Sequence, residues 1–353
     1  MSSSFDTLII GGGLSGLWLT HRLHQAGQRV GLIEAREGLG GSSRRQSTVE
    51  FIPATQENAD LMEWCRSLAP LPLQSEVRDH RPQMYDEGKW RPFAGFGETT
   101  FQSVGELSSF SQAHELSVSP SLEQLVRALI EQLPVVALTR HEVTSLKVQD
   151  GLVREVVVNG DKTMHANQVI FTPHPGLLNT LIEGEGLAGK HRTRLAKMNG
   201  WTSVALELKH TPPLLEDSSV RIFNHNAKEF EPVIGRVDGE RSLWMTLVPF
   251  ERENEHEFVG QCIRHIKRQL KRAWPDRLDG QLEEKIYVGA HAFGQHGLKT
   301  KDPHRFPEIA NLHMANHMLA SQPAPLGSLE VARSVEEAVI AASKELPDLG
   351  ASC

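Results

Sequence analysis

The chain opens with two short apolar runs, at 7–10 and 29–33, that flank a segment with apolar residues at helical spacing, 14–26. Continuous apolar runs of this length are typical of parallel strands that are buried on both faces. The intervening segment has one apolar side and is followed by Gly27, a common helix stop. The pattern therefore predicts a β-α-β unit at the start of the chain.

In the rest of the chain, segments in which apolar and polar residues alternate, as in strands, are interspersed with segments in which apolar residues recur at helical spacing. A polar turn at 86–88 inside 81–98 predicts a hairpin. Between 119 and 175 we expect a helix, a strand ending near Val143, a hairpin and a strand over 168–171. The stretch 181–299 predicts a sheet with a covering helix. Its expected elements are a basic helix around 192–197, strands at 202–208, 220–223, 232–237 and 242–248, and a helix at 255–274.

The turn after the first strand contains three glycines, Gly11, Gly13 and Gly16, in the spacing G-x-G-x-x-G. In a dinucleotide site the first allows the tight turn, the second lets a pyrophosphate approach, and the third lets the helix pack closely. The helix N-terminus favours a diphosphate. Glu34 follows at the tip of the second strand, where a carboxylate can bind ribose hydroxyls. A carboxylate there disfavours a 2′-phosphate, so the unit predicts NAD or FAD rather than NADP.

Composition excludes several classes of function. The chain has 353 residues and a net charge of −7, without a basic tract, which argues against nucleic acid or an anionic membrane surface as partner. No apolar run reaches the length of a spanning helix, and the N-terminus does not read as a signal peptide. The three cysteines, Cys65, Cys262 and Cys353, are too scattered for a disulfide framework or metal knuckle. We expect a cytoplasmic protein without a transmembrane segment.

The segment EAREGLGG, residues 34–41, resembles the sequence that follows the fingerprint in the flavin-containing amine oxidase superfamily. This superfamily includes amine and polyamine oxidases, protoporphyrinogen oxidases and phytoene desaturase-like enzymes. The resemblance implies that Gly40 and Gly41 wrap the diphosphate and ribityl chain of FAD. Family members usually have Arg directly after the glycine pair, whereas Ser42 and Ser43 stand here before Arg44.

Two later segments resemble the same superfamily. Residues 119–175 are similar to its second FAD segment, in which the backbone at Val143 would contact the adenine end. Residues 311–342 are similar to the closing motif, with Ala315-Asn316 where the family has glycine and an acid. The resemblance implies noncovalent FAD. The implied FAD-binding residues are Gly11, Gly13, Leu14, Ser15, Gly16, Glu34, Ala35, Arg36, Gly40, Gly41, Ser42, Val143, Thr172, Asn316, Gly327, Ser328 and Leu329.

The expected fold is α/β, with a Rossmann-like FAD-binding domain interleaved with a smaller α+β substrate domain. Residues 1–75, 115–180 and 300–346 are assigned to the FAD-binding domain, and 76–114 and 181–299 to the substrate domain. Residues 347–353 are expected to form a tail.

The catalytic residues are harder to assign. Alignment with the strand that bears the family's flavin-associated lysine puts Thr202 or Ser203 at its position. Histidine can act as acid or base near neutral pH, so His291 and His296 are candidates together with Ser203, although both histidines could instead only bond loop backbone. Phe293 and Gln295 are further candidates to line the cavity, and so are Tyr85, Trp201 and Trp244, for which core packing is the alternative. His313 and His317 are four residues apart, but no third ligand is near in sequence, so no metal site is expected.

Three functions are compatible with these features. The first is an FAD-dependent oxidoreductase that takes hydride from a C–N or C–C bond of a small or medium organic substrate. The second is a flavoprotein that oxidises a side chain of a protein or larger partner. The third is a non-catalytic FAD-binding protein. Without the family's lysine and closing-motif acid, all three remain open.

Overall fold

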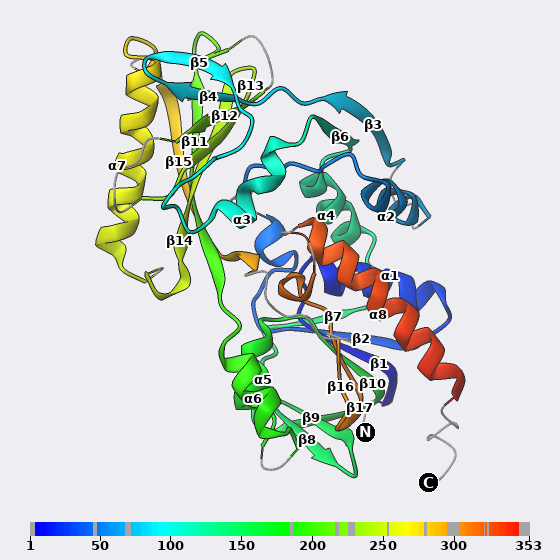
Figure 1. The fold of residues 1–353 in the computed structure, drawn as a ribbon. Helices are drawn as coiled ribbons and strands as arrows, with labels where there is room; N and C mark the ends of the chain where they lie inside the picture. Colours follow the sequence, from blue (N-terminus) through cyan, green and yellow to red (C-terminus); the bar gives the residue numbers. More distant parts are fainter. Residues whose placement is uncertain are drawn as a thin grey trace.

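The computed structural model describes residues 4–44, 48–67, 72–183, 186–215, 219–224, 230–252, 254–278, 281–294, 304–320, 322 and 325–345. Its strands form an eight-stranded sheet, a seven-stranded sheet and a two-stranded sheet (Figure 1). No helix in this part of the chain has the length and apolar character needed to cross a bilayer.

The eight-stranded sheet is built on the N-terminal β-α-β unit. Strand β1 (Ser4–Ile10) lies between β2 (Val30–Glu34) and β10 (Lys162–Phe171), parallel to both. The path continues outwards through β7 (Ala137–Thr139) on one side and β17 (Ile309–Met314) and β16 (Arg305–Phe306) on the other. A hairpin of β8 (Val143–Gln149) and β9 (Leu152–Val158) pairs with the start of β10. The parallel centre brings the carboxyl ends of β1, β2, β10 and β17 to one edge.

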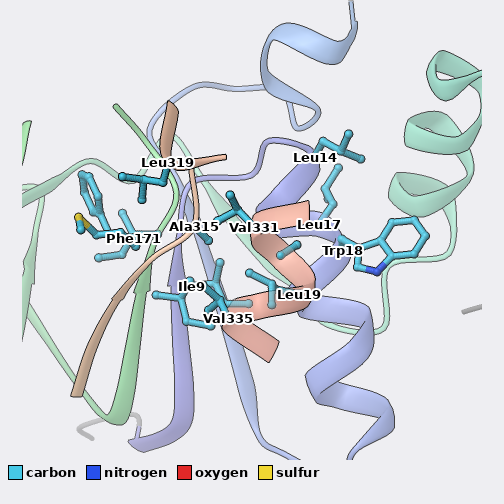
Figure 2. Close-up of a cluster of buried hydrophobic side chains, with 14 of the residues drawn as sticks. Ile9, Leu14, Leu17, Trp18, Leu19, Phe171, Ala315, Leu319, Val331 and Val335 are labelled. Atoms are coloured by element: carbon cyan, nitrogen blue, oxygen red, sulfur yellow. The ribbon is translucent and has the colours of Figure 1, made fainter. Parts of the chain in front are cut away.

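Helices bury the apolar strands of this sheet. The N-terminal helix α1 (Leu14–Gln25) packs against α8 (Leu326–Glu345) and α4 (Leu122–Glu131). Figure 2 shows Ile9 of β1, Leu17 of α1 and Val335 of α8 in one cluster, and all three side chains are fully buried. An ion pair of 2.8 Å between Arg22 and Glu336 also joins α1 to α8. The closing helix therefore lies against the helix that begins at the glycine turn.

The seven-stranded sheet runs in the order β15-β11-β14-β13-β12-β4-β5. Its strands are β4 (Gln83–Asp86), β5 (Lys89–Pro92), β11 (Gly200–His210), β12 (Val220–Phe223), β13 (Val233–Asp238), β14 (Arg241–Pro249) and β15 (Gln281–Gly294). Alternate residues of β11 contribute to two apolar clusters, one on each face. The amphipathic helix α7 (His256–Ala273) covers one face, as the sequence pattern predicted.

Short elements connect the two large sheets. They include α2 (Gln56–Arg66), α3 (Val104–Leu107), α5 (Leu178–Leu181), α6 (Gly189–Ala196) and the two-stranded sheet of β3 (Gln74–Asp79) and β6 (His114–Ser119). Single 3-10 turns lie at Gly41–Arg44, Ser108–Ser111, Pro175–Leu177, Phe250–Arg252 and His317–Leu319. The α/β fold class is confirmed, whereas the domain boundaries remain a prediction.

Candidate functional site

The glycine turn between β1 and α1 has the shape that the fingerprint predicted. Gly11 has a φ of +97°, which a residue with a side chain rarely adopts. A Cβ at Gly16 would lie 2.0 Å from the carbonyl oxygen of Gly11, so α1 can approach the turn only because Gly16 has no side chain. A Cβ at Gly13 would meet no protein atom within 4 Å. Gly13 therefore borders open space.

Glu34 ends β2 beside this turn, and the backbone fixes its carboxylate. One carboxylate oxygen accepts a hydrogen bond of 2.7 Å from the Gly12 amide, and the other accepts one of 2.8 Å from the Arg36 amide. These bonds hold the charged group at the carboxyl edge of the sheet. The remaining lone pairs of both oxygens can accept hydrogen bonds from a diol.

A cavity of about 500 Å³ runs from Glu34 to the end of β15. The sequence-predicted residues in its lining are Gly11, Gly13, Leu14, Ser15, Glu34, Ala35, Arg36, Gly41, Ser42, Val143, Thr172, His291, Asn316 and Ser328. They come from the glycine turn, the β2 tip, the starts of β8 and α8, the loops after β10 and β17, and β15. The structure thus brings together residues from the three segments that resemble FAD-binding sequences and His291 from a fourth part of the chain.

Four other sequence-predicted residues do not line this cavity but support it. Gly16 packs against Gly11, and the Gly40 amide donates a 2.7 Å hydrogen bond to the Gly12 carbonyl. A Cβ at Gly327 would lie 2.2 Å from the backbone oxygen of Gln322, and Leu329 is fully buried in the core. We infer that these residues shape the cavity wall rather than face it.

Asn316, which stands where the closing motif that the sequence resembles has an acid, links two loops. Its side-chain nitrogen donates to the carbonyl oxygens of Thr172, at 2.9 Å, and Pro173, at 3.2 Å. Its side-chain oxygen accepts from the Met318 amide at 3.0 Å. Both amide hydrogens are therefore used within the protein, and Asn316 ties the end of β17 to the loop after β10.

The end of the cavity farthest from Glu34 is built from aromatic rings. The His291 ring stacks on His174, with centroids 4.2 Å apart, and on Phe250, at 4.4 Å. His291 lies in a bulge of β15, because Ser203 pairs with Gly289 while Trp201 pairs with Phe293, and its φ is +52°. A left-handed backbone at a residue other than glycine is strained and commonly marks a functional site.

His317 holds this bulge in place. Its Nε2 donates a 2.5 Å hydrogen bond to the carbonyl oxygen of His291. Burial lowers the pKa of His291 to about 4, and burial also lowers the pKa of His317. Both imidazoles are therefore neutral at neutral pH. The described lining contains two carboxylates, those of Glu34 and Glu142, and one guanidinium, that of Arg36. All three lie at the end of the cavity opposite to His291.

Other sequence candidates lie away from the cavity. Ser203 is fully buried in β11, and its hydroxyl is 3.9 Å from the Met245 sulfur. Trp201 and Trp244 belong to the apolar clusters on the two faces of the seven-stranded sheet. The Tyr85 hydroxyl donates to the Arg272 carbonyl at 2.9 Å. Core packing, the alternative left open for these three aromatic residues, accounts for their positions. Phe293 also packs in one of the clusters. His296 and Gln295 lie outside the described residues.

The sequence reasoning missed His174, which follows the Thr172-Pro173 turn and stacks on His291. Nothing in its local pattern signals the contact, because its partner is more than a hundred residues away. His313 and His317 point to different partners, since His313 Nε2 bonds Gln168 at 2.9 Å. Among the described residues, no group of three or more histidine, cysteine or acidic side chains is arranged to hold a metal.

Comparison with known proteins places the site in a wider fold. Residues 6–175 match the family model of the FAD binding domain. A putrescine oxidase variant superposes with a TM-score of 0.69 at 14% identity, covering 97% of this chain and 100% of the other. An oxidoreductase from Methanosarcina mazei superposes with a TM-score of 0.69 at 14% identity, covering 95% of this chain and 100% of the other. Cyclohexylamine oxidase from Brevibacterium oxydans superposes with a TM-score of 0.68 at 12% identity, covering 97% of this chain and 99% of the other.

No curated protein matches the sequence. At these identities the structural similarity shows the fold alone, and the family-model match covers just under half of the chain. Residues 6–175 thus match an FAD binding domain, and the fold of the chain is similar to that of the solved putrescine and cyclohexylamine oxidases.

Proposed function

We propose that the chain is an FAD-dependent oxidoreductase that binds FAD noncovalently and oxidises a C–N or C–C bond of a small or medium organic substrate. The observation that carries the proposal is the single cavity that joins the Glu34 carboxylate to the histidine cluster. FAD has a ribose-bearing end and a redox-active ring end, and the cavity has a polar end and an aromatic end to match.

The residues at the polar end fit the nucleotide part of FAD. The open space at Gly13 leaves room for the diphosphate at the N-terminus of α1, where free amides favour negative charge. Glu34 is oriented to accept hydrogen bonds from the ribose, and the backbone near Val143 lines the wall beside it. Each contact uses a group that the protein already holds in place.

The aromatic end would receive the flavin ring. Bound FAD supplies the redox chemistry by accepting a hydride from the substrate. The chain contributes a wall formed by His174, His291 and Met318, which excludes water and limits how the ring can sit. Burial lowers the pKa values of His291 and His317, so both imidazoles are neutral. This wall therefore offers hydrogen bonds rather than positive charge.

This neutral wall predicts a slow reaction of the reduced protein with oxygen. Ser203, which the alignment puts at the position of the family's lysine, is buried away from the cavity, and the lowered pKa values of His291 and His317 keep both imidazoles neutral. A neutral site does not stabilise the negative charge that develops as oxygen is reduced. Photoreduced protein mixed with aerated buffer in a stopped-flow instrument should reoxidise slowly. Rapid reoxidation that is lost in His291→Asn would contradict this expectation and assign the charge to His291.

The proposal is tested first by the visible spectrum. Protein purified with FAD should show a flavin spectrum near one FAD per chain, and acid precipitation should release the colour into the supernatant. Neither Cys65 nor Cys262, both buried, lines the cavity, so a thioether link is not expected. Colour that stays in the pellet would overturn noncovalent binding. Anaerobic bleaching by candidate amines would then establish the substrate oxidation.

A second candidate function, oxidation of a side chain on a protein partner, is favoured by one observation. Leu177 lines the cavity and is still 49% exposed, so the wall beside His174 opens to the surface. If this function is correct, small amines leave the flavin oxidised while a protein substrate bleaches it. A flavin that no substrate bleaches would support the third function, non-catalytic FAD binding.

A further inference from the structure

The two edges of the seven-stranded sheet are built differently. At one edge, β5 has only four residues, and Lys89, Arg91 and Pro92 are exposed. Short strands with charges and proline are typical of edges that avoid pairing with another chain. At the other edge, β15 has 14 residues and pairs along one side with β11. No strand of the described residues pairs with its other side.

The exposed edge strand carries apolar side chains. Ile286 and Val288 are each 50% exposed and project from the same face, two residues apart. They lie opposite Leu206 and Val204 of β11, which α7 buries completely. Helix α7 therefore covers the inner strands and leaves the apolar residues of β15 in solvent. Two large apolar side chains on an unpaired edge are a recognised site of strand pairing.

We propose that a second copy of this chain pairs antiparallel with β15 and joins the two sheets into one. A two-fold axis at Tyr287, perpendicular to the sheet, keeps the helix-covered faces on the same side. In that register Ile286 lies opposite Val288 of the second copy. The charged residues Glu284 and Lys285 lie opposite Ala290 and Gly289, so no like charges face each other.

The pattern of side chains favours a second copy over an unrelated strand. About this axis Ile286 meets Val288, the charged Glu284 and Lys285 meet Ala290 and Gly289, and Glu283 meets the imidazole of His291. An axis moved to Ile286 would instead place Glu284 opposite Val288. The strand is thus complementary to itself in one register. It also continues into Ala290 and His291, which line the cavity, so pairing would brace the bulge that holds His291.

Light scattering after size exclusion of the FAD-loaded protein tests the association. Wild type should be a dimer, and Val288→Lys should be a monomer with an unchanged far-UV spectrum and retained flavin. Val136 is 85% exposed and distant from β15 in the sequence, so Val136→Lys provides a matched control that should remain dimeric. A monomeric wild type, or a Val288→Lys variant that stays dimeric, would overturn the proposal.

Cysteine cross-linking tests the register. Directly opposed residues of antiparallel strands have Cα atoms about 4.5–5.5 Å apart, within the range that a disulfide spans. In a Cys353→Ser background, the double variant Ile286→Cys, Val288→Cys should form a covalent dimer on mild oxidation. Each single variant places its cysteine diagonally from its copy and should cross-link much less. Equal cross-linking by a single variant would reject the axis at Tyr287.

Discussion

The two ends of the cavity are made in different ways. The end at Glu34 is formed mainly by backbone, because glycines give the turn its shape and amides orient the carboxylate. The end at His291 is formed by side chains from four distant segments, including His174, Phe250 and His317. The first end carries charge, whereas burial makes His291 and His317 neutral.

This difference separates binding from reactivity. A backbone-shaped end depends on the absence of side chains and tolerates little change, so we expect it to control FAD affinity. A side-chain stack can be altered without moving the backbone of the sheet, so we expect it to control the behaviour of the bound flavin. Substitutions at the two ends should therefore have effects of different size and kind.

Gly16→Ala should have the largest effect. The new Cβ would lie 2.0 Å from the backbone oxygen of Gly11, so α1 or the turn must move. Overpacking of this kind typically lowers the free energy of unfolding by about 3 kcal/mol, and we expect FAD retention to be lost as well. Denaturant unfolding and flavin content measure the two effects. Gly105→Ala, whose Cβ would meet no atom within 4 Å, is the control and should change neither.

Glu34→Gln should weaken FAD binding without disturbing the fold. Loss of the charge removes a charge-assisted hydrogen bond to ribose, which contributes about 2 kcal/mol, or roughly a 30-fold change in affinity. A flavin titration by fluorescence measures the affinity. Glu37→Gln, at an exposed neighbour that pairs with Arg140, should bind FAD normally. Equal affinities of the two variants would show that Glu34 is not on the ribose.

Acid should destabilise the protein between pH 6.5 and 4. Burial lowers the pKa of His313 to about 3 and that of His291 to about 4, from an ordinary value of 6.5. In this pH range the unfolded chain binds protons that the folded chain does not, so stability falls as pH falls. In His313→Gln, the free energy of unfolding should fall by about 2 kcal/mol less than in wild type over this pH range. Unfolding curves at several pH values measure it, with the exposed His24→Gln as control. Parallel curves for wild type and His313→Gln would contradict the buried neutral state.

His317→Phe should have the smallest effect on FAD affinity and a distinct effect on the flavin. It removes the hydrogen bond to the His291 carbonyl, which contributes about 1 kcal/mol to the fold. The bulge of β15 would lose one of its restraints while Glu34 and the glycine turn stay intact. We expect a shifted flavin spectrum with affinity close to wild type. A loss of affinity as large as that of Glu34→Gln would show that the two ends do not act separately.

The sequence predicted the geometry of the glycine turn and the position of Glu34 because their signals are local, whereas their role in binding FAD stays a prediction. Gly11, Gly13 and Glu34 lie within one β-α-β unit, and the spacing of that unit fixes their geometry. It predicted the other end poorly because side-chain stacking joins distant segments. His174 went unnoticed, and Trp244 was a candidate although it packs in the core beneath α7. Local patterns do not show which face of a strand a helix will cover.

A crystal structure of the protein with bound FAD tests the central claim most directly. We predict that the ribose hydroxyls lie within hydrogen-bond distance of the Glu34 carboxylate and that the diphosphate passes Gly13. The isoalloxazine ring should lie against the wall formed by His174, His291 and Met318, with the His317 bond to the His291 carbonyl intact. A ribose away from Glu34, or a flavin ring outside the histidine end, would contradict this assignment of the cavity.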